Sequence, residues 1–326
     1  MLDILEEIEK NGYHDMRNDE KQSQTFGLDS TENQVDLKSK TTGYNEEDST
    51  KNVQVIIMKV DNDSFKLSTK TYELKMQGKT MLSWVENAVK DFDIREVEMN
   101  ANADFLSLAK QNINGEKKYT LVLFADAPLI KSSTVSEIVE YFVIKDLSVL
   151  KFTRGYMFKT QYLLTIDKLY APQVQYFEEE DFITCYNLKQ FALVNDILKS
   201  RILSYHQKNG VVITDPVSTI IEADVSIEEG VKLLAGSKIL GNSVIEKGAV
   251  ISYNSIVDSS VVMTNSFVEN SIIKHSIIGK NCVIKNYSIV EQKAVIGDNC
   301  TLCGYNLVKS KSLLEGVTLE EYEKRL

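Results

Sequence analysis

The stretch SIIGKNCVIKNYSIVEQKAVIGDNCTL, residues 276–302, decides the fold of the C-terminal third of the chain. An aliphatic residue recurs in it at every sixth position, from Ile278 to Leu302, and a small or compact residue lies two positions before each one. A fixed short repeat is the signature of a solenoid. A six-residue period predicts a left-handed parallel β-helix of hexapeptide repeats, in which three faces make one triangular coil. The aliphatic residues are expected to fill its interior.

The same period continues on both sides of this stretch, so we expect the β-helix to cover residues 206–317. Between two regular series, Ser-led units recur every five or six residues from Ser255 to Ser276, which predicts shorter coils. Thr318 and Glu321 form a capping-box pattern, so a short helix over residues 318–326 is expected to cover the last coil. The regular inward positions outside the quoted stretch are Ile221, Ile227, Leu233, Ile239, Ile245, Ile251, Val257, Val308 and Leu314.

Residues 52–205 alternate between strand and helix patterns. This alternation predicts an α/β, Rossmann-like domain with a mostly parallel sheet. A longer helix is expected to end at Gly210, because glycine is common just after the last residues of a helix, where the backbone turns with a positive φ. The expected strands include residues 53–58 and 119–125, and the expected helices residues 81–92, 135–147 and the segment from 188 onward.

Residues 1–51 are polar and carry 13 acidic and 6 basic residues, which is most of the net charge of −10. They offer too little apolar surface to offset the entropy of ordering, so a disordered acidic tail is expected. The alternative is that the short apolar run Leu2–Ile8 forms a helix that docks on a protein partner.

The remaining chain is nearly neutral, which argues against a nucleic-acid or anionic-membrane surface as its main role. No apolar run approaches the roughly 18 residues of a membrane span, and the acidic N-terminus does not resemble a secretory signal. A cytoplasmic location is expected. The four cysteines do not look like a disulfide framework in a chain of this length.

Three segments carry a resemblance to a known family. They are residues 187–231 (NLKQFALVNDILKSRILSYHQKNGVVITDPVSTIIEADVSIEEGV), residues 124–130 (FADAPLI) and residues 78–89 (GKTMLSWVENAV). Together they resemble the bacterial bifunctional N-acetylglucosamine-1-phosphate uridyltransferase/glucosamine-1-phosphate acetyltransferase. The resemblance implies a truncated nucleotidyltransferase-like domain before the β-helix, a nucleotide sugar such as UDP-N-acetylglucosamine as ligand, and a homotrimer.

The phosphate-binding loop of that family is not preserved. Its glycines let backbone N–H groups approach a triphosphate, but Val60 and Asn62 stand at those positions here. Asp61 and Asp63 would repel phosphate. Lys70 is the remaining candidate for a catalytic cation that contacts phosphate.

Two positions match the metal ligands of the family, namely Asp126 and Asn187. The resemblance implies that they hold Mg²⁺ together with substrate phosphates. The structural alternative is that Asp126 makes a strand-end turn and that Asn187 caps the following helix. The segment between them is much shorter than in the family, and the missing part normally carries the sugar-binding strands.

His275 is the single histidine of the solenoid and the candidate base of an acyltransferase. The alternative is a surface histidine on a coil, since no acidic residue that would orient it is evident. Cys300 and Cys303 have the spacing of a metal or redox pair, but Cys300 also falls one coil after Cys282, which favours stacked core cysteines.

Three functions are open at this point, and the lost phosphate loop and the missing sugar-binding segment favour the first. The first is a non-catalytic scaffold or regulator, a pseudoenzyme related to the synthesis of nucleotide sugars and cell-envelope precursors. The second is an active sugar-1-phosphate nucleotidyltransferase with a remodelled phosphate loop, which uses Lys70, Asp126 and Asn187. The third is a hexapeptide acyltransferase with His275 as its base.

Overall fold

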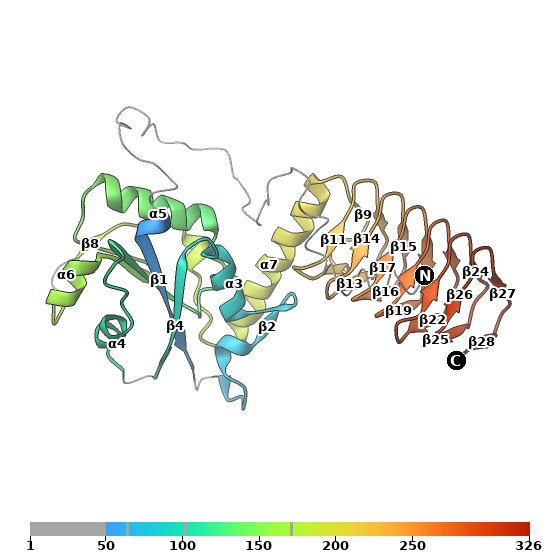
Figure 1. The fold of residues 1–326 in the computed structure, drawn as a ribbon, viewed down its shortest axis with the longest axis horizontal. Coiled ribbons are helices and arrows are strands. Elements are labelled where there is room, and N and C mark those ends of the chain that lie inside the picture. The colour runs from blue at the N-terminus through green and yellow to red at the C-terminus, as the bar shows by residue number, and fades with distance from the viewer. Residues whose placement is uncertain (1–49, 63–64, 101–102, 170–171) are drawn as a thin grey trace.

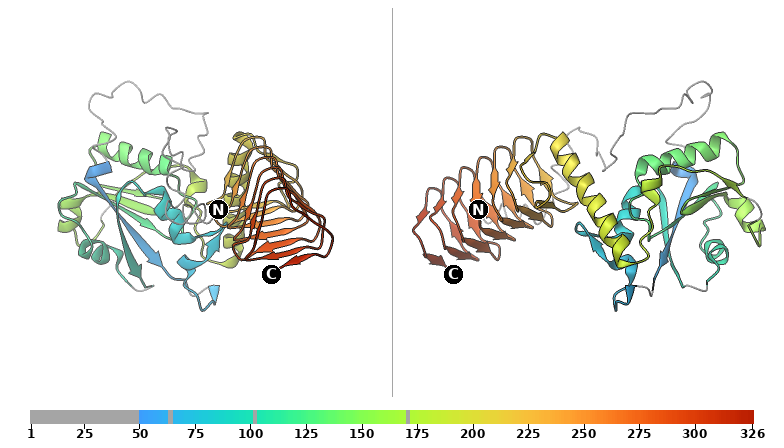
Figure 2. Two further views of the ribbon diagram at one scale, coloured as in Figure 1. Left: turned by 45° about the vertical axis from the view of Figure 1, so that its right-hand side comes forward. Right: turned by 180° about the vertical axis from the view of Figure 1, so that it is seen from behind.

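The computed structural model describes residues 50–62, 65–100, 103–169 and 172–326. They form an α/β domain and a triangular parallel β-helix, joined by a long helix (Figures 1 and 2). The fold class expected from the sequence is thereby confirmed. The predicted tail and docking helix fall almost entirely outside the described residues. Within the described ranges, no helix combines the length and the apolar character that a membrane crossing requires.

The α/β domain is a three-layer sandwich around a six-stranded sheet. Strands β4, β1 and β5 are parallel, whereas β7 runs antiparallel to both of its neighbours. Helices α3 and α5 pack on one face of the sheet, and α4 and α6 pack on the other. The strand order is β4 (Asp93–Met99), β1 (Val53–Val60), β5 (Tyr119–Phe124), β7 (Gly155–Lys159), β6 (Val149–Phe152) and β8 (Gln173–Val174). The helices are α3 (Met81–Ala88), α4 (Phe105–Gln111), α5 (Ser132–Ile144) and α6 (Thr160–Thr165), with 3-10 turns η3 (Thr71–Glu73) and η4 (Glu179–Phe182).

Helix α7 (Leu188–Lys208) joins the two units, and its ends are set by local sequence. At its start the Asn187 side chain accepts a hydrogen bond from the Gln190 backbone N–H at 3.0 Å. At its end Gly210 has φ +84°, and the Val211 N–H donates to the His206 carbonyl. This is a Schellman-type ending, and it confirms the predicted termination at Gly210.

The β-helix consists of three parallel sheets, and the strands at one position of successive coils lie directly above one another (Figure 2). Almost all the predicted inward aliphatic residues are buried. One sheet contains β10 (Ile220–Ile221), β13 (Lys238–Leu240), β16 (Ile256–Asp258), β19 (Ile272–Lys274), β22 (Ile289–Glu291), β25 (Leu307–Lys309) and β28 (Lys324–Arg325). The second contains β11 (Ser226–Ile227), β14 (Val244–Ile245), β17 (Val261–Val262), β20 (Ile277–Ile278), β23 (Val295–Ile296) and β26 (Ser312–Leu313). The third contains β9 (Val212–Ile213), β12 (Lys232–Leu233), β15 (Val250–Ser252), β18 (Phe267–Glu269), β21 (Val283–Ile284), β24 (Thr301–Leu302) and β27 (Thr318–Leu319).

The coil lengths follow the sequence spacing in the middle of the β-helix. Lys238 pairs with Ile256, but Ile256 pairs with Ile272, so this coil is two residues shorter than its predecessor. The shorter coils predicted from the Ser-led units are therefore present. Buried serines at their corners, such as Ser255 and Ser271, donate to backbone carbonyls of their own and the next coil.

Two expectations for the C-terminal coil are wrong. Leu314 is 66% exposed, whereas Leu313 is buried, because the coil drops one residue and the inward position shifts by one. Residues 318–326 contain strands β27 and β28 instead of a capping helix. Both strands pair with the coil before them, and continuing this ladder satisfies more backbone groups than a short isolated helix would.

A hairpin of the α/β domain, β2 (Lys75–Met76) and β3 (Lys79–Thr80), contacts the first coil of the β-helix. The Ala223 N–H donates to the Gln77 carbonyl at 3.0 Å, and Lys79 pairs with Asp224 at 2.8 Å. Buried residues of this hairpin, of α7 and of the β-helix interior belong to one continuous apolar cluster. The two units therefore share a core at their junction.

Candidate functional site

The candidate site lies at the carboxyl edge of the α/β sheet, where ligands commonly bind in such folds. The turn after β1 is held by its own side chains. Asp61 Oδ2 lies 2.8 Å from Lys70 Nζ, and Asp61 Oδ1 accepts a hydrogen bond from the Thr71 backbone N–H at 3.1 Å. The Asn62 side-chain amide donates to the Tyr186 carbonyl at 3.2 Å. This turn is thus tied both to the segment after it and to the segment before α7.

The charge of Lys70 is compensated within this turn. Its hydrogen bond lowers the pKa of Asp61, and the Asp61 carboxylate in turn raises the pKa of Lys70. Both groups therefore remain charged and paired near neutral pH. Lys70, the expected phosphate contact, faces an aspartate of its own chain, and its side chain is 53% exposed. Asp63 lies outside the described residues.

Asp126 follows β5 and is 7% exposed. Its two carboxylate oxygens accept hydrogen bonds from Arg154, at 3.0 Å from Nε and 2.5 Å from Nη2. The Arg154 guanidinium also lies 4.2 Å from the centre of the Phe124 ring. A bidentate pair of this geometry on an aromatic face is a strong and specific arrangement.

The β6–β7 hairpin positions Arg154. Leu123 of β5 pairs with Gly155 of β7, so the residue before Gly155 falls beside the end of β5. Gly155 is required here, because a Cβ atom would lie 2.3 Å from the Phe152 ring and 2.7 Å from the Val122 carbonyl oxygen. The antiparallel register therefore brings Arg154 to Asp126.

Asn187, the second expected metal ligand, caps α7 through its side-chain oxygen. The Cys185 backbone N–H donates to the Asp126 carbonyl at 2.7 Å, so the segment before α7 lies against Asp126. The side-chain oxygens of Asp126 and Asn187, which would be the metal ligands, are thus both engaged by the protein itself. Over the described ranges, no cluster of three or more His, Cys, Asp or Glu side chains could hold a metal ion. These residues do not fit Mg²⁺ in this conformation.

The remaining predicted groups lie elsewhere. His275 is exposed at a β-helix corner with φ +45°, and its backbone N–H donates to the Asp258 carbonyl. Cys282 and Cys300 are fully buried inward residues. Burial raises the pKa of Cys282 to about 11, and burial with the nearby Asp126 raises that of Cys185 to about 12. The thiols of Cys282 and Cys185 are therefore unreactive at neutral pH.

Sequence reasoning missed Arg154 and an ionic cluster around Asp181. Arg154 opens the stretch RGYMF, residues 154–158, and nothing in the neighbouring sequence links it to Asp126. Asp181 is fully buried and pairs with Lys131 at 3.0 Å and Arg201 at 2.8 Å. Its partners come from α7 and from the segment before α5, so only the folded arrangement reveals the cluster.

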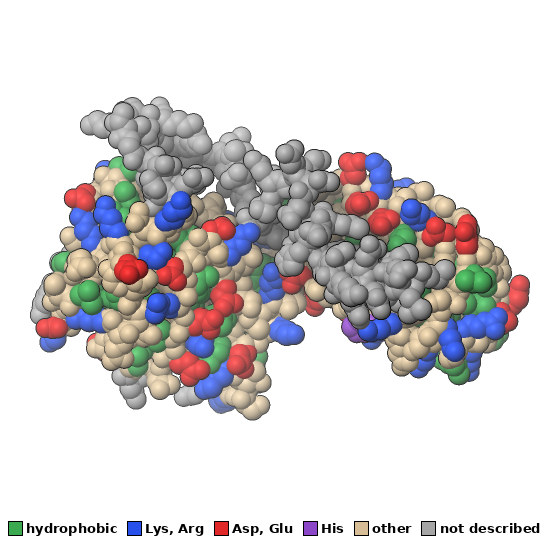
Figure 3. Space-filling model, viewed as in Figure 1, with side chains coloured by type: hydrophobic (Ala, Val, Ile, Leu, Met, Phe, Trp, Pro, Cys, Tyr) green, Lys and Arg blue, Asp and Glu red, His purple; other side chains and the backbone are tan. Residues whose placement is uncertain are grey.

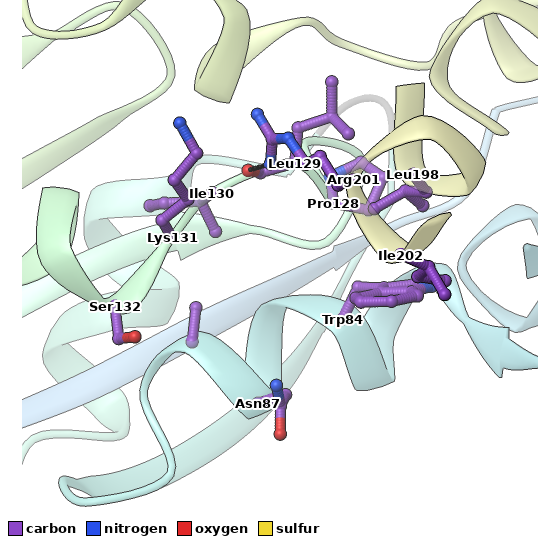
Figure 4. Close-up of a pocket in the computed structure, with 11 residues that line it drawn as sticks. Trp84, Asn87, Pro128, Leu129, Ile130, Lys131, Ser132, Leu198, Arg201 and Ile202 are labelled. Carbon is purple, nitrogen blue, oxygen red and sulfur yellow. Dashed lines mark hydrogen bonds between the residues drawn. The ribbon is translucent and has the colours of Figure 1, made fainter. Parts of the chain in front are cut away.

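Lys131 and Arg201 also line a small open recess between α3, the segment after β5, and α7 (Figure 4). The Trp84 ring forms part of its wall, and the indole N–H donates to the Met76 carbonyl at 2.9 Å. Lys131 and Arg201 are both paired with Asp181, and Arg201 also pairs with Glu180, so two carboxylates balance the two cations of the recess.

The outer surface shows no strong charge bias on the face drawn in Figure 3. Basic and acidic side chains of the described residues lie interspersed over both the α/β domain and the β-helix. This distribution agrees with the nearly neutral balance of the chain after its acidic N-terminal segment.

Comparison with known proteins finds relatives for part of this chain. The family described as GMPPB C-terminal domain matches residues 221–325. The bifunctional protein GlmU of Clostridium novyi is 32% identical over 105 residues, which is 32% of this chain and 23% of that protein. GlmU of Rubrobacter xylanophilus is 38% identical over 80 residues, which is 24% of this chain and 17% of that protein. The resemblance expected from the sequence is confirmed, and the matched part spans less than a quarter of these relatives' length.

Two solved structures are similar to part of the chain. Rv0371c of Mycobacterium tuberculosis is 10% identical with a TM-score of 0.35, over 44% of this chain and 98% of that one. The 4-diphosphocytidyl-2C-methyl-D-erythritolsynthase of Anaerococcus prevotii is 9% identical with a TM-score of 0.35, over 46% and 99%.

Proposed function

We propose that the chain is a non-catalytic scaffold or regulator built on a nucleotidyltransferase-like domain and a hexapeptide-type β-helix. The observation that carries this proposal is the bidentate pair between Arg154 and Asp126. It engages both oxygens of the carboxylate on which metal-assisted nucleotidyl transfer would depend. The Lys70–Asp61 pair supports the same conclusion, because Asp61 already compensates the charge of Lys70.

By analogy with the GlmU proteins that part of the chain resembles, we propose a role near the synthesis of nucleotide sugars and cell-envelope precursors, in the cytoplasm. The nucleotide-sugar ligand and the protein partner implied by the sequence belong to this proposal. Lys70 and Asn187 then serve structural roles, Lys70 in the turn after β1 and Asn187 as the cap of α7.

We expect purified full-length protein to release no pyrophosphate from UTP with hexose 1-phosphates in the presence of Mg²⁺. We also expect Mg²⁺ and UDP-N-acetylglucosamine together to shift the melting temperature no more than either does alone. Ligand at a hundredfold excess over its Kd would add about 2.7 kcal/mol of stability, which a melting curve detects readily. A working bifunctional GlmU serves as the positive control. Turnover that Asp126→Ala abolishes would refute the proposal.

A homotrimer is part of the same proposal. Half-buried apolar residues form a straight outward row on one face of the β-helix, because each pairs with the next along the sheet. The row consists of Ile256, Ile272, Ile289 and Leu307. Flat faces with such rows suit packing around a threefold axis.

We expect the protein to sediment at three times its chain mass of 36.9 kDa at micromolar concentration. Replacing Ile272 and Ile289 of the outward row by lysine is expected to release monomers. A wild-type protein that sediments as a monomer would contradict the trimer.

A further inference from the structure

The pair between Asp126 and Arg154 combines three features that an ordinary surface ion pair lacks. The carboxylate is nearly fully buried, whereas most surface pairs lie between exposed groups. Two separate guanidinium nitrogens contact the two oxygens. The Phe124 ring lies beneath the guanidinium. A buried carboxylate needs a partner of this quality, because desolvation of an unpaired charge costs several kcal/mol.

Backbone hydrogen bonds fix the position of the Asp126 main chain independently of Arg154. The Ala125 N–H donates to the Met58 carbonyl of β1, and the Cys185 N–H donates to the Asp126 carbonyl. Removing the Arg154 side chain is therefore expected to leave Asp126 at the same place, with a space beside it that is open to water. The Arg154 side chain itself is 31% exposed.

We propose that Arg154 is a built-in cation that takes the place of a divalent metal ion beside Asp126, and that its removal uncovers a latent divalent-cation site. This inference deepens the proposed function, on which it rests, because it names the residue that closes the site. The carboxylate then acts as a structural anion, and the carboxyl edge of the sheet keeps its arrangement without any metal.

The latent site would supply one carboxylate, with water completing the coordination. Mg²⁺ and Mn²⁺ sites commonly keep several waters and use one or two carboxylates, so such a site is chemically reasonable but weak. We therefore expect millimolar rather than micromolar affinity, and Mn²⁺ is the suitable probe because its binding is followed directly by electron paramagnetic resonance.

The test compares full-length wild type with Arg154→Ala, without nucleotide or sugar. The variant is expected to melt at a lower temperature than wild type in metal-free buffer. Millimolar Mn²⁺ is expected to raise its melting temperature by about 3 °C and to bind at least about tenfold more tightly than to wild type. Wild type should not respond to Mn²⁺ or to EDTA.

Three controls make the result specific. Arg154→Lys keeps a cation at the same position and should remain insensitive to Mn²⁺. Lys159→Ala removes a cation from an exposed pair with Asp146 on the same hairpin and should not create a metal response. The double variant Arg154→Ala with Asp126→Asn should lose the Mn²⁺ response because the carboxylate is absent.

Several outcomes would overturn the inference. These are an Arg154→Ala protein that folds but ignores Mn²⁺, one that stays unfolded with or without Mn²⁺, and a response that survives in the double variant. A variant that folds only with Mn²⁺ would support it. Since no readout involves turnover, these failures are distinct from a failure of the proposed function, which is judged on wild-type catalysis.

Discussion

Replacing Arg201 by alanine is expected to lower the free energy of unfolding by about 3 kcal/mol. Arg201 Nη2 lies 2.8 Å from Asp181 Oδ1, and Arg201 Nη1 donates to the Leu129 carbonyl at 2.6 Å. Asp181 is fully buried. Loss of Arg201 would leave a buried carboxylate with less compensating charge, which is one of the few ways in which a single substitution causes a large loss.

The expected loss lies at the lower end of the 3–5 kcal/mol typical of broken buried pairs for two reasons. Lys131 and Thr134 still contact Asp181, at 3.0 and 2.5 Å. Arg201 also lines the open recess beside Trp84, so its removal would let water reach the carboxylate more easily (Figure 4).

Chemical denaturation of both proteins at neutral pH measures this loss. The matched control is Lys199→Ala on the same helix, since Lys199 is only partly buried and donates to the carbonyl of the exposed Val217. That change should stay within about 0.5 kcal/mol. If Arg201→Ala also stayed within that range, the cluster would contribute little to the attachment of α7.

Lowering the pH from 7 to 4 is expected to cost about 3 kcal/mol of stability through His206 alone. His206 lies in the last turn of α7, is 2% exposed, and neither ring nitrogen has a hydrogen-bond partner. Burial lowers its pKa from 6.5 to about 4. A neutral imidazole fits this apolar surrounding, whereas an imidazolium does not.

The sign follows from the lowered pKa. Above pH 6.5 the histidine is neutral in both the folded and the unfolded chain, so its contribution is constant. Between pH 6.5 and about 4, His206 binds a proton in the unfolded chain but not in the folded chain. The free energy of unfolding therefore falls as the pH falls. The difference of about 2.5 pKa units corresponds to about 3 kcal/mol.

Unfolding curves from pH 7 to pH 4 for wild type and His206→Leu check this expectation. The leucine variant should lose this part of the pH dependence and should be no less stable than wild type at pH 7, because it removes two unpartnered polar atoms. His275→Asn is the control, since His275 is exposed at a corner where asparagine also fits. An unchanged pH dependence in His206→Leu would refute the role of His206.

Much of the fold could be predicted from the sequence because the decisive contacts repeat over short distances. In the β-helix, each aliphatic residue meets its counterpart one coil later, and the six-residue period states this directly. Where the spacing changed by one residue, before Leu314, the extrapolated pattern failed. Helix α7 was also predictable, because its caps, Asn187 and Gly210, act on their own neighbours.

The candidate site was predictable only in part. The sequence singled out Asp126, Asn187 and Lys70, but it did not reveal which groups they contact. The Asn187 side-chain oxygen accepts a hydrogen bond from the Gln190 backbone N–H in the first turn of α7. Lys70 pairs with Asp61, nine residues before it.

By itself, the sequence determined the coiled architecture, the α/β alternation and the loss of the glycine-rich turn, because each depends on neighbouring residues. Only the tertiary structure decided that Arg154 meets Asp126 and that Arg201 meets Asp181. The first pair depends on the antiparallel register of β5 and β7, and the second on the docking of α7. Such contacts join side chains distant in the chain, and burial of their charges makes them strong once the fold has brought them together.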